Sequence, residues 1–212
     1  MQNIPMFTSE YGVAGLILES VPYRQEAYIR IQSTQEPEKL LEECVKFCAS
    51  CGAERIYATG HPVLEKYPLH TALWQMRSDI HSIGNTDAAL WPVQPDTAAR
   101  FREIYNKKAE KLPNSVWMDE AEEKEMLKEG DGYFVHQDGQ LLGIGRVKGE
   151  EIRFLGSVQP GAGETVLRAL THAITGERVS LEVASVNHKA IALYERLGFI
   201  KTAELSRWYK IK

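Results

Sequence analysis

The stretch VASVNHKAIALYERLGF, from Val183 to Phe199, predicts a helix that begins after Asn187 and ends before Gly198. Asparagine is a favoured N-cap, because its side-chain oxygen accepts a hydrogen bond from a backbone N–H of the first turn. Glycine is favoured just past a helix, because it adopts positive φ angles without strain. Between these ends, apolar residues recur at the spacing of one buried face: Ala190, Leu193, Tyr194 and Leu197.

A strand is predicted immediately before this helix. The segment VSLEVA, from Val179 to Ala184, alternates apolar and polar residues with a period of two. The unit is therefore strand, short turn, helix. Tyr194 stands out within it, because a tyrosine hydroxyl at the edge of a buried face needs a hydrogen-bond partner or a chemical role.

Residue patterns elsewhere predict alternating strands and helices. From residue 86 on we expect strand Leu90–Val93, a helix opened by Pro95 and Asp96, helix Asp119–Glu129, strands Gly132–His136, Leu141–Lys148 and Glu151–Val158, a glycine turn and helix in PGAGETVLRAL, and a last strand Thr202–Ile211. Before residue 86 we expect strands Val13–Glu19 and Ala27–Ile31, a helix from Pro37 to Gly52, and strands Arg55–Thr59 and Leu69–Ser78.

Two segments in the first part of the chain resemble two segments in the second part. KLLEECVKFCASCGAERIYATG matches TVLRALTHAITGERVSLEVAS in pattern, and HTALWQMRS matches KTAELSRWYK. The first part lacks a counterpart of much of the Asn187 helix. We therefore predict two domains, a truncated copy over residues 1–85 and a complete domain over residues 86–212. Chance similarity between such short segments is the alternative.

Composition excludes several classes of function. The 212 residues are 43% hydrophobic, and their formal net charge of −4 comes from interspersed charges, without the basic stripe of a nucleic-acid-binding protein. No apolar run approaches the ~18 residues that span a bilayer, and no basic segment leads into an apolar run as in a signal peptide. We expect a cytoplasmic protein that contacts neither nucleic acid nor membrane.

The three cysteines, Cys44, Cys48 and Cys51, have the C-x3-C-x2-C spacing that holds an iron–sulfur cluster in radical SAM enzymes. On the helix expected from Pro37 to Gly52 they share one face with Leu40, Leu41, Val45 and Phe47. A free cysteine in such a position behaves as a small core residue. We therefore favour buried thiols over a cluster. The six histidines show no spacing typical of a metal site, so no metal is expected.

The closing segment also carries a family resemblance. LEVASVNHKAIALYERLGF is similar to the signature L-E-V-x-x-x-N-x-x-A-x-x-L-Y-x-x-x-G-F of the GNAT superfamily of acetyl-CoA-dependent N-acetyltransferases. The likeness is strongest to members that acetylate the N-terminal alanine of a ribosomal protein, and the element order over residues 88–212 agrees with the family. The resemblance implies an α/β fold with a mixed central sheet flanked by helices, preceded by a truncated half-domain of the same kind.

The resemblance implies two catalytic residues. Tyr194 would be the general acid that protonates the thiolate leaving a thioester, and Glu182 would be the general base that takes a proton from the amine. A buried tyrosine with a satisfied hydroxyl is the alternative for Tyr194. Glu182 could instead point to the solvated side of its strand, in which case Glu151 or an ordered water would be the base.

The resemblance also implies an acetyl-CoA site. Amide groups at the start of a helix bind phosphates well, and the glycine turn supplies such a start. The candidate residues are Val158, Gly161, Ala162, Gly163, Glu164, Thr165 and Asn187. The family pattern Arg/Gln-x-x-Gly-x-Gly/Ala is incomplete here, because Val158 stands where Arg or Gln is usual and Glu164 adds a negative charge. Weak acyl-CoA binding, or a plain loop between strand and helix, are the alternatives.

Other residues are weaker candidates. The tryptophans Trp74, Trp91, Trp117 and Trp208 fit core or interface positions. The acidic run DEAEEKE from Asp119 fits a solvated helix face, or an edge that attracts a cationic amine. The closing segment SRWYKIK could pair with a second copy in a homodimer.

The sequence therefore predicts an enzyme that transfers the acetyl group of acetyl-CoA to a primary amine of a small molecule or peptide by direct attack. The alternative is a non-catalytic module that keeps the fold to bind an acyl-CoA or a protein partner. Neither the acceptor nor the role of the first 85 residues follows from the sequence.

Overall fold

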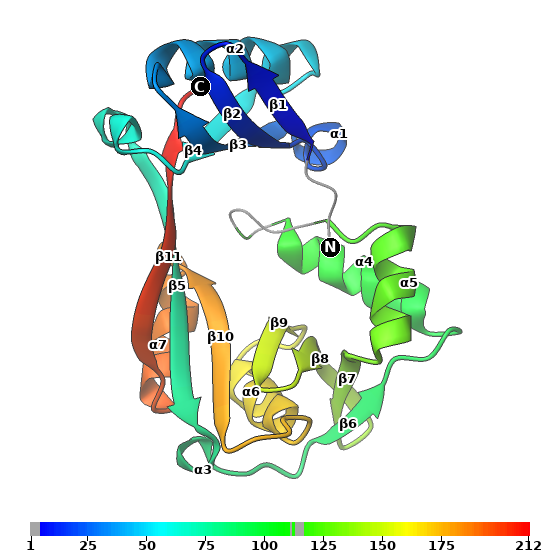
Figure 1. Ribbon diagram of the computed structural model, residues 1–212. Coiled ribbons are helices and arrows are strands. Elements are labelled where there is room, and N and C mark those ends of the chain that lie inside the picture. The colour runs from blue at the N-terminus through cyan, green and yellow to red at the C-terminus, as the bar shows by residue number, and fades with distance from the viewer. Residues whose placement is uncertain (1–4, 111, 113–116) are drawn as a thin grey trace. The chain divides into compact units, whose positions relative to one another are not determined.

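The computed structural model describes residues 5–110, 112 and 117–212. These residues form a mixed α/β fold, as predicted, with one 11-stranded sheet of order β1-β2-β3-β4-β11-β5-β10-β9-β8-β7-β6 (Figure 1). The strands are β1 (Met6–Ser9), β2 (Gly12–Ile17), β3 (Glu26–Thr34), β4 (Arg55–Thr59), β5 (Leu69–Asp79), β6 (Ala89–Pro92), β7 (Gly132–Gln137), β8 (Gln140–Lys148), β9 (Glu151–Ser157), β10 (Arg178–Ala184) and β11 (Ile200–Lys210).

Helices connect and cover these strands. They are α1 (Val21–Arg24), α2 (Pro37–Ser50), the 3₁₀ helix η1 (Pro62–Lys66), α3 (Ile80–Ile83), α4 (Ala98–Ala109), α5 (Glu120–Glu129), α6 (Gly163–Thr171) and α7 (His188–Arg196). In the described residues, no helix is both long enough and apolar enough to cross a membrane.

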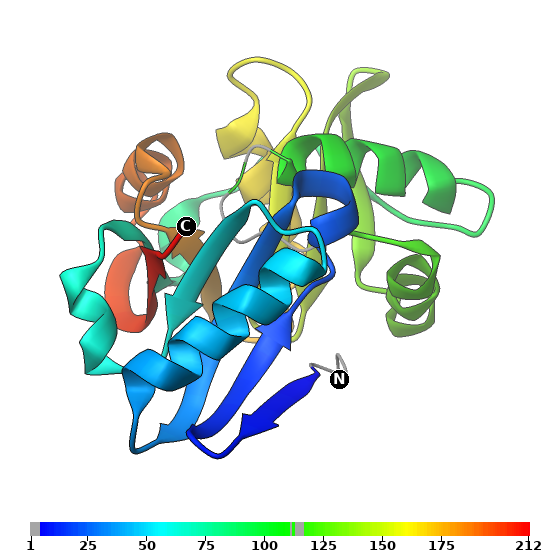
Figure 2. The same cartoon turned by 90° about the horizontal axis from the view of Figure 1, so that it is seen from above.

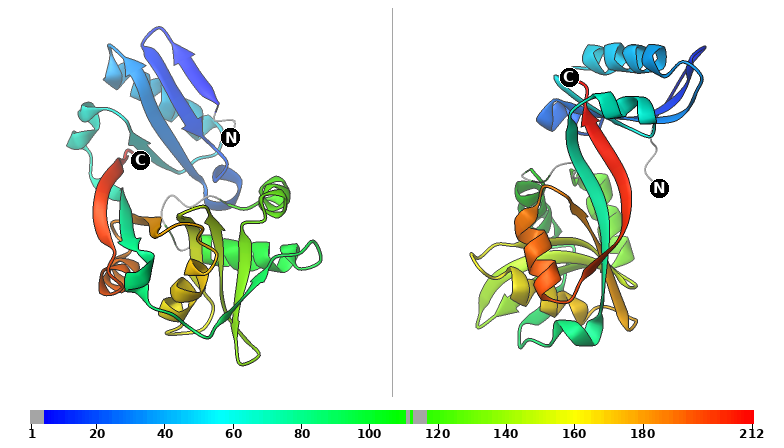
Figure 3. Two further views of the ribbon diagram at one scale, coloured as in Figure 1. Left: turned by 60° about the horizontal axis from the view of Figure 1, so that its bottom comes forward. Right: turned by 90° about the vertical axis from the view of Figure 1, so that its left-hand side faces the viewer.

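The chain divides into two compact units. The first contains Met1–Leu73 and Leu205–Lys212, and the second contains Trp74–Glu204. β5 and β11 run side by side and each contributes residues to both units (Figure 3). The units therefore do not divide at the predicted boundary near residue 86. That residues 1–85 are a truncated copy stays a prediction.

In the first unit, α2 joins the parallel strands β3 and β4 and lies across one face of the sheet (Figure 2). Apolar side chains of β3 pack there against Leu40 and Leu41 of α2. The opposite face carries three buried aromatic residues, Tyr28, Tyr57 and Trp208. Strand order around β11 is β4-β11-β5.

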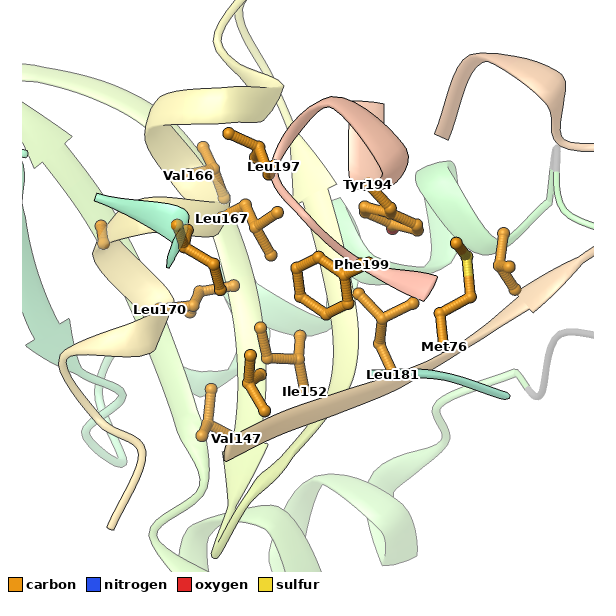
Figure 4. Close-up of a cluster of buried hydrophobic side chains, with 14 of the residues drawn as sticks. Met76, Val147, Ile152, Val166, Leu167, Leu170, Leu181, Tyr194, Leu197 and Phe199 are labelled. Atoms are coloured by element: carbon orange, nitrogen blue, oxygen red, sulfur yellow. The ribbon is translucent and has the colours of Figure 1, made fainter. Parts of the chain in front are cut away.

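In the second unit, two helix layers cover opposite faces of the sheet. α6 and α7 cover the face that we call the α6/α7 face, whose core includes Leu181 of β10 and Tyr194 of α7 (Figure 4). α4 and α5 cover the other face, called the α4/α5 face, whose core includes Phe101 of α4, Met126 of α5 and Phe154 of β9. Strand order around β5 is β10-β5-β11, so the two echoing segments HTALWQMRS and KTAELSRWYK are neighbouring strands.

The predicted helix ends are confirmed where local chemistry sets them. Asn187 caps α7 by accepting a hydrogen bond from the Ala190 N–H at 3.3 Å, and Gly198 follows the helix with φ +85°. Asp138 and Gly139 form the hairpin turn between β7 and β8, with positive φ at both positions, as an Asp-Gly pair favours. The short elements β1, α1, η1 and α3 were not predicted.

Two predictions about individual segments are wrong. SRWYKIK is not free to pair with a second copy, because β11 lies between β4 and β5 inside the sheet. On the cysteine helix, Cys44 and Cys48 are buried as predicted, but Cys51 is exposed and Phe47 is 43% exposed. Cys51 lies past the last turn of α2 as its C-cap, and Phe47 instead packs at a tilt against Phe7 of the edge strand β1, with ring centroids 5.6 Å apart.

Two glycines of β8 allow α6 to approach the sheet closely. A Cβ at Gly145 would lie 2.4 Å from Leu170 Cδ1, and one at Gly143 would lie 2.6 Å from Val166 Cγ2. Val166 and Leu170 are one helical turn apart, so this contact sets the distance of α6 from the sheet. It thereby positions the first turn of α6, where the candidate site lies.

We predict that Gly145→Ala lowers the free energy of unfolding by about 1–3 kcal/mol, because the added methyl group overpacks the contact with Leu170. Urea denaturation followed by circular dichroism measures the effect. The same substitution in a Leu170→Ala background should cost clearly less, because the atoms that it meets are then absent. Equal costs in the two backgrounds would contradict this account.

Candidate functional site

The parallel strands β9 and β10 pair over only two residue pairs. Ser180 lies opposite Glu151 and Leu181 opposite Ile152, and no later pair joins the strands, although β9 continues to Ser157 and β10 to Ala184. The facing backbone edges are therefore unpaired toward the carboxyl ends of both strands. Ligands of α/β proteins commonly bind at such carboxyl ends.

A β-bulge lies on β9 where this pairing stops. Arg146 of β8 pairs with Phe154 and Val147 pairs with Ile152, so Arg153 is an extra residue on β9. The bulge changes which side chains face each helix layer: Ile152 packs on the α6/α7 face, whereas Phe154 packs on the α4/α5 face. Bulges bend a strand and redirect its backbone, and they are frequent next to active sites.

The glycine turn delivers the chain from β9 into α6. Gly161 has φ +80°, and a Cβ at this position would meet no atom within 4 Å, so the backbone there borders open space. The N-cap of α6, Ala162, makes no side-chain capping hydrogen bond. The first amide groups of α6 therefore keep their donors for a ligand, and the helix dipole favours an anion at this end.

Glu164 does not leave an uncompensated charge at this helix start. Its carboxylate contacts Arg168 at 2.8 Å and Arg196 of α7 at 2.9 Å. The hydrogen bond from Arg168, followed by that from Arg196, lowers the pKa of Glu164. The predicted unfavourable charge is thus balanced by two guanidinium groups, and the pair with Arg196 ties α6 to α7. The spacing of Glu164 and Arg168 is visible in the sequence, whereas the contact with Arg196 is not.

Tyr194 lies at the edge of the α6/α7 core, as Figure 4 shows. Its ring packs on Phe199 with centroids 5.7 Å apart, and the residue is 8% exposed. Its hydroxyl has no hydrogen-bond partner within the described residues. Burial raises the pKa of Tyr194 to about 12, so the phenol is protonated at neutral pH.

Glu182 faces the other side of β10 from Tyr194. Its neighbours Leu181 and Val183 point into the α6/α7 core, so by the alternation of a strand Glu182 points to the α4/α5 face. Desolvation, and then the negative charge of Glu151, raise the pKa of Glu182. The structure therefore brings the two predicted alternatives for the base, Glu182 and Glu151, to one face, while Glu182 itself retains solvent exposure.

Val158 and Asn187 are both engaged within the chain. The Val158 N–H donates to Leu142 O at 2.8 Å, and its side chain packs against the α4/α5 core. The Asn187 side chain is the cap of α7. A role for either residue in binding a ligand stays a prediction.

A polar groove beside Val158 was not predicted. It is lined by residues of α4, by the start of β8 and by the loop after β9, and it includes Arg100, Lys107, Lys108, Gln140 and Gln159. The stem of Lys108 lies over Gly156, where a Cβ would come within 3.2 Å of Lys108 Cγ. Lys108 is half-buried, and no carboxylate of the described residues pairs with it. The spacing of α4 gives no sign of this contact, because Gly156 is distant in sequence.

The acidic run from Asp119 is only partly a solvated face. Asp119 caps α5, Glu122 pairs with Arg146 at 2.7 Å, and Glu123 pairs with Arg102 at 3.2 Å. Arg146 is buried and also binds Asp131, with Nη2 2.9 Å from Oδ2. Glu129 and Asp131 also pair with Arg153 at the bulge, at 2.6 and 3.2 Å. These pairs fix the bulge to α5.

No group of three His, Cys, Asp or Glu side chains in the described residues could hold a metal ion. Burial raises the pKa of Cys44 to about 11 and that of Cys48 to about 12, so both thiols stay protonated at neutral pH. Protonated thiols are poor ligands and poor nucleophiles.

Comparison with solved structures identifies the fold. A functionally unknown conserved protein from Staphylococcus epidermidis ATCC 12228 superposes with a TM-score of 0.62 at 13% identity, over 98% of this chain and 93% of that one. An acetyltransferase from the GNAT family of Colwellia psychrerythraea gives 0.54 at 12% identity, over 98% and 84%. The fold is that of GNAT acetyltransferases.

A tandem GNAT protein from the clavulanic acid biosynthesis pathway is also similar, with a TM-score of 0.52 at 15% identity, over 96% of this chain and 79% of that one. The search against family models found no match, and neither did the search of curated proteins. The likeness is thus one of GNAT and tandem-GNAT architecture at low sequence identity. It does not single out the ribosomal-protein alanine N-acetyltransferases.

We predict that Tyr194 contributes to a loss of stability above pH 10. Its pKa is raised from 10.0 to about 12 by burial, so the unfolded chain ionises first as the pH rises. The contribution is complete below pH 10 and falls by about 2 kcal/mol on going to pH 12. Urea denaturation of wild type and Tyr194→Phe across this range measures it.

Other tyrosines whose pKa is raised by burial, such as Tyr105, lower the stability at high pH equally in both proteins. The difference between the two stability curves therefore isolates Tyr194. Parallel curves from pH 9 to pH 12 would mean that the hydroxyl is as well solvated in the folded as in the unfolded protein.

Proposed function

We propose that the second unit transfers an acetyl group from acetyl-CoA to a primary amine. The observation that carries the proposal is the early end of pairing between β9 and β10, next to the uncapped start of α6, within a GNAT fold. Each of these features suits one part of the substrate: the unpaired edges suit its amide-containing arm, and the helix start suits its diphosphate.

Backbone groups of the second unit would bind the two parts of acetyl-CoA. Amides of Gly163, Glu164 and Thr165 at the start of α6 would donate to the diphosphate, and Gly161 lets the backbone approach it. The unpaired backbone groups of β9 beyond Ile152 and of β10 beyond Leu181 would hydrogen-bond an extended chain of amides. Asn187 would support this arrangement by fixing the start of α7.

Tyr194 would assist departure of the sulfur. The amine nitrogen attacks the thioester carbon, and the carbon–sulfur bond breaks as the tetrahedral intermediate collapses. A phenol with a pKa of about 12 is fully protonated at neutral pH and donates a hydrogen bond to the negative charge on sulfur. The amine loses one proton and the departing thiolate gains one, so the products are an amide and the free thiol of CoA.

Glu182 would accept the proton of the attacking amine. A carboxylate whose pKa is raised is a stronger base than an ordinary glutamate, and Glu151 on the same face maintains that shift. Both carboxylates lie on the α4/α5 face, where they would also favour the approach of a cationic amine. Glu151 or a water bound between them is the alternative base.

Lys108 would supply the positive charge that the glycine turn lacks at Val158. It is half-buried beside the carboxyl end of β9, and no described carboxylate pairs with it. A cation in this position would attract the phosphates of acetyl-CoA while the ligand approaches the start of α6. The resemblance of Leu181–Phe199 to alanine N-acetyltransferases makes the amino terminus of a peptide one candidate acceptor, beside small amines.

The alternative is a non-catalytic module. Two observations favour this alternative. Val158 stands where a polar donor is usual, and its N–H already donates to the carbonyl oxygen of Leu142. In that case the fold would bind an acyl-CoA or a protein partner without turnover. Acetylation assays with a panel of amines separate the two readings.

We predict that Tyr194→Phe lowers kcat by about 100-fold or more, because the leaving sulfur loses its hydrogen-bond donor. The Kd for acetyl-CoA should be unchanged in calorimetric titration. Tyr209→Phe is the matched control, since Tyr209 is equally exposed at 8% and belongs to the first unit. Wild-type kcat in Tyr194→Phe would refute the assigned role.

We predict opposite effects of two charge changes on acetyl-CoA binding. Lys108→Met should raise Kd about fivefold, whereas Glu164→Gln should lower it, because the negative charge at the start of α6 is removed and Arg196 loses its partner. Lys124→Met on α5 removes the same charge from an exposed position and should have no effect. Calorimetry at two salt concentrations tests this, and the absence of binding to wild type would support the protein-interaction module.

A further inference from the structure

The first unit contains a polar groove that the acetyltransferase proposal does not use. It lies where the pairing of the parallel strands β3 and β4 ends, at the pair of Arg30 on β3 and Thr59 on β4. Gln32, Gly60 and Ser206 complete its polar lining. Here β3 and β4 stay paired over five successive residue pairs, from Glu26–Arg55 to Arg30–Thr59, so no extended chain can enter between them. Any ligand must bind at the strand ends.

Arg30 is exposed and its guanidinium lies beside a buried aromatic cluster. Its guanidinium carbon lies 6.0 Å from the ring centroid of Trp208, which is 5% exposed. Trp208 packs edge-on against Tyr28 at 5.4 Å, and its Nε1–H donates to Ser206 Oγ at 3.1 Å. Within the described residues Arg30 has no ion pair. It therefore presents to the groove a guanidinium group whose charge no described carboxylate compensates.

Two hydroxyl groups lie beside this guanidinium group. Thr59 is only 6% exposed, yet its hydroxyl has no hydrogen-bond partner within the described residues. The hydroxyl oxygen itself is not fully buried, so it can donate a hydrogen bond to a ligand in the groove. Ser206 accepts from Trp208, which leaves its own proton available to donate. The groove thus has hydrogen-bond donors from three residues and no carboxylate of its own.

Glu26, the carboxylate on the same face of β3 as Arg30, would not repel an anion in the groove. Glu26 is 6% exposed and is paired with Arg24 at 3.1 Å and Arg55 at 3.2 Å. It also accepts a hydrogen bond from the Tyr28 hydroxyl at 2.9 Å. Its charge is therefore compensated by two cations before Arg30 is counted.

We propose that this groove binds the oxyanion group of a small molecule, a carboxylate or a phosphate. The Arg30 fork pairs with two oxygens, because guanidinium geometry matches both groups, and the Thr59 and Ser206 hydroxyls donate to the same oxygens. The site lies wholly within the first unit, and the proposal does not depend on acetyl transfer in the second.

The indole Nε1–H of Trp208 provides a direct test, because it is bonded to Ser206 in the groove. ¹⁵N-labelled full-length protein is titrated at constant ionic strength with inorganic phosphate, and separately with acetate and citrate. We expect a saturable shift of the Trp208 indole resonance, while those of Trp74, Trp91 and Trp117 stay unchanged. Tighter binding of phosphate or of a carboxylate identifies which oxyanion the site prefers.

Variants locate the binding. Arg30→Gln should weaken it roughly tenfold or more, and Thr59→Val severalfold, whereas Arg30→Lys should retain part of it. Lys210→Gln on β11 removes one positive charge from an exposed residue outside the groove and should leave binding intact. Thr59→Val decides the matter if Arg30→Gln does not fold. No saturable shift with any anion at millimolar concentration, or equal binding by Arg30→Gln and wild type, would overturn the proposal.

Discussion

The second unit depends on one constraint, the end of pairing between β9 and β10 after Leu181 and Ile152. Backbone groups in a sheet are normally paired, and leaving them unpaired has a cost unless water or a ligand satisfies them. The Arg153 bulge lies at this point and is held to α5 through Glu129 and Asp131. On the other face of the sheet, Glu164 and Arg196 join α6 to α7. Arg153 thus anchors β9 to α5 at the point where its pairing with β10 ends.

The first unit repeats the strand–helix–strand plan with the opposite outcome. β3, α2 and β4 follow the same order as β9, α6 and β10, yet β3 and β4 remain paired over five residue pairs. α2 begins at Pro37 and no glycine lies between β3 and α2, so this connection differs from the glycine turn that precedes α6. One plan would therefore support the two proposed sites: unpaired strand edges for an extended substrate, and a polar groove beside paired strands for a compact anion.

The sequence was sufficient for features that depend on neighbours along the chain. The cap at Asn187, the stop at Gly198, the Asp138–Gly139 turn and the mixed α/β class all follow from local chemistry and periodicity. Features that depend on distant residues could not be predicted. The contact of Arg196 with Glu164, the position of Lys108 over Gly156 and the exposure of Phe47 each require knowledge of which elements pack together.

The passage of β5 and β11 through both units bears on how the chain is made. Residues 205–212 belong to the first unit, so that unit is incomplete until residue 212 has left the ribosome. Cutting at the predicted boundary near residue 86 would take residues 74–85 from one unit and residues 205–212 from the other. Neither fragment would then carry a whole sheet. Synthesis from the amino terminus thus cannot complete the first unit before the second, and contacts of such long sequence separation fold slowly.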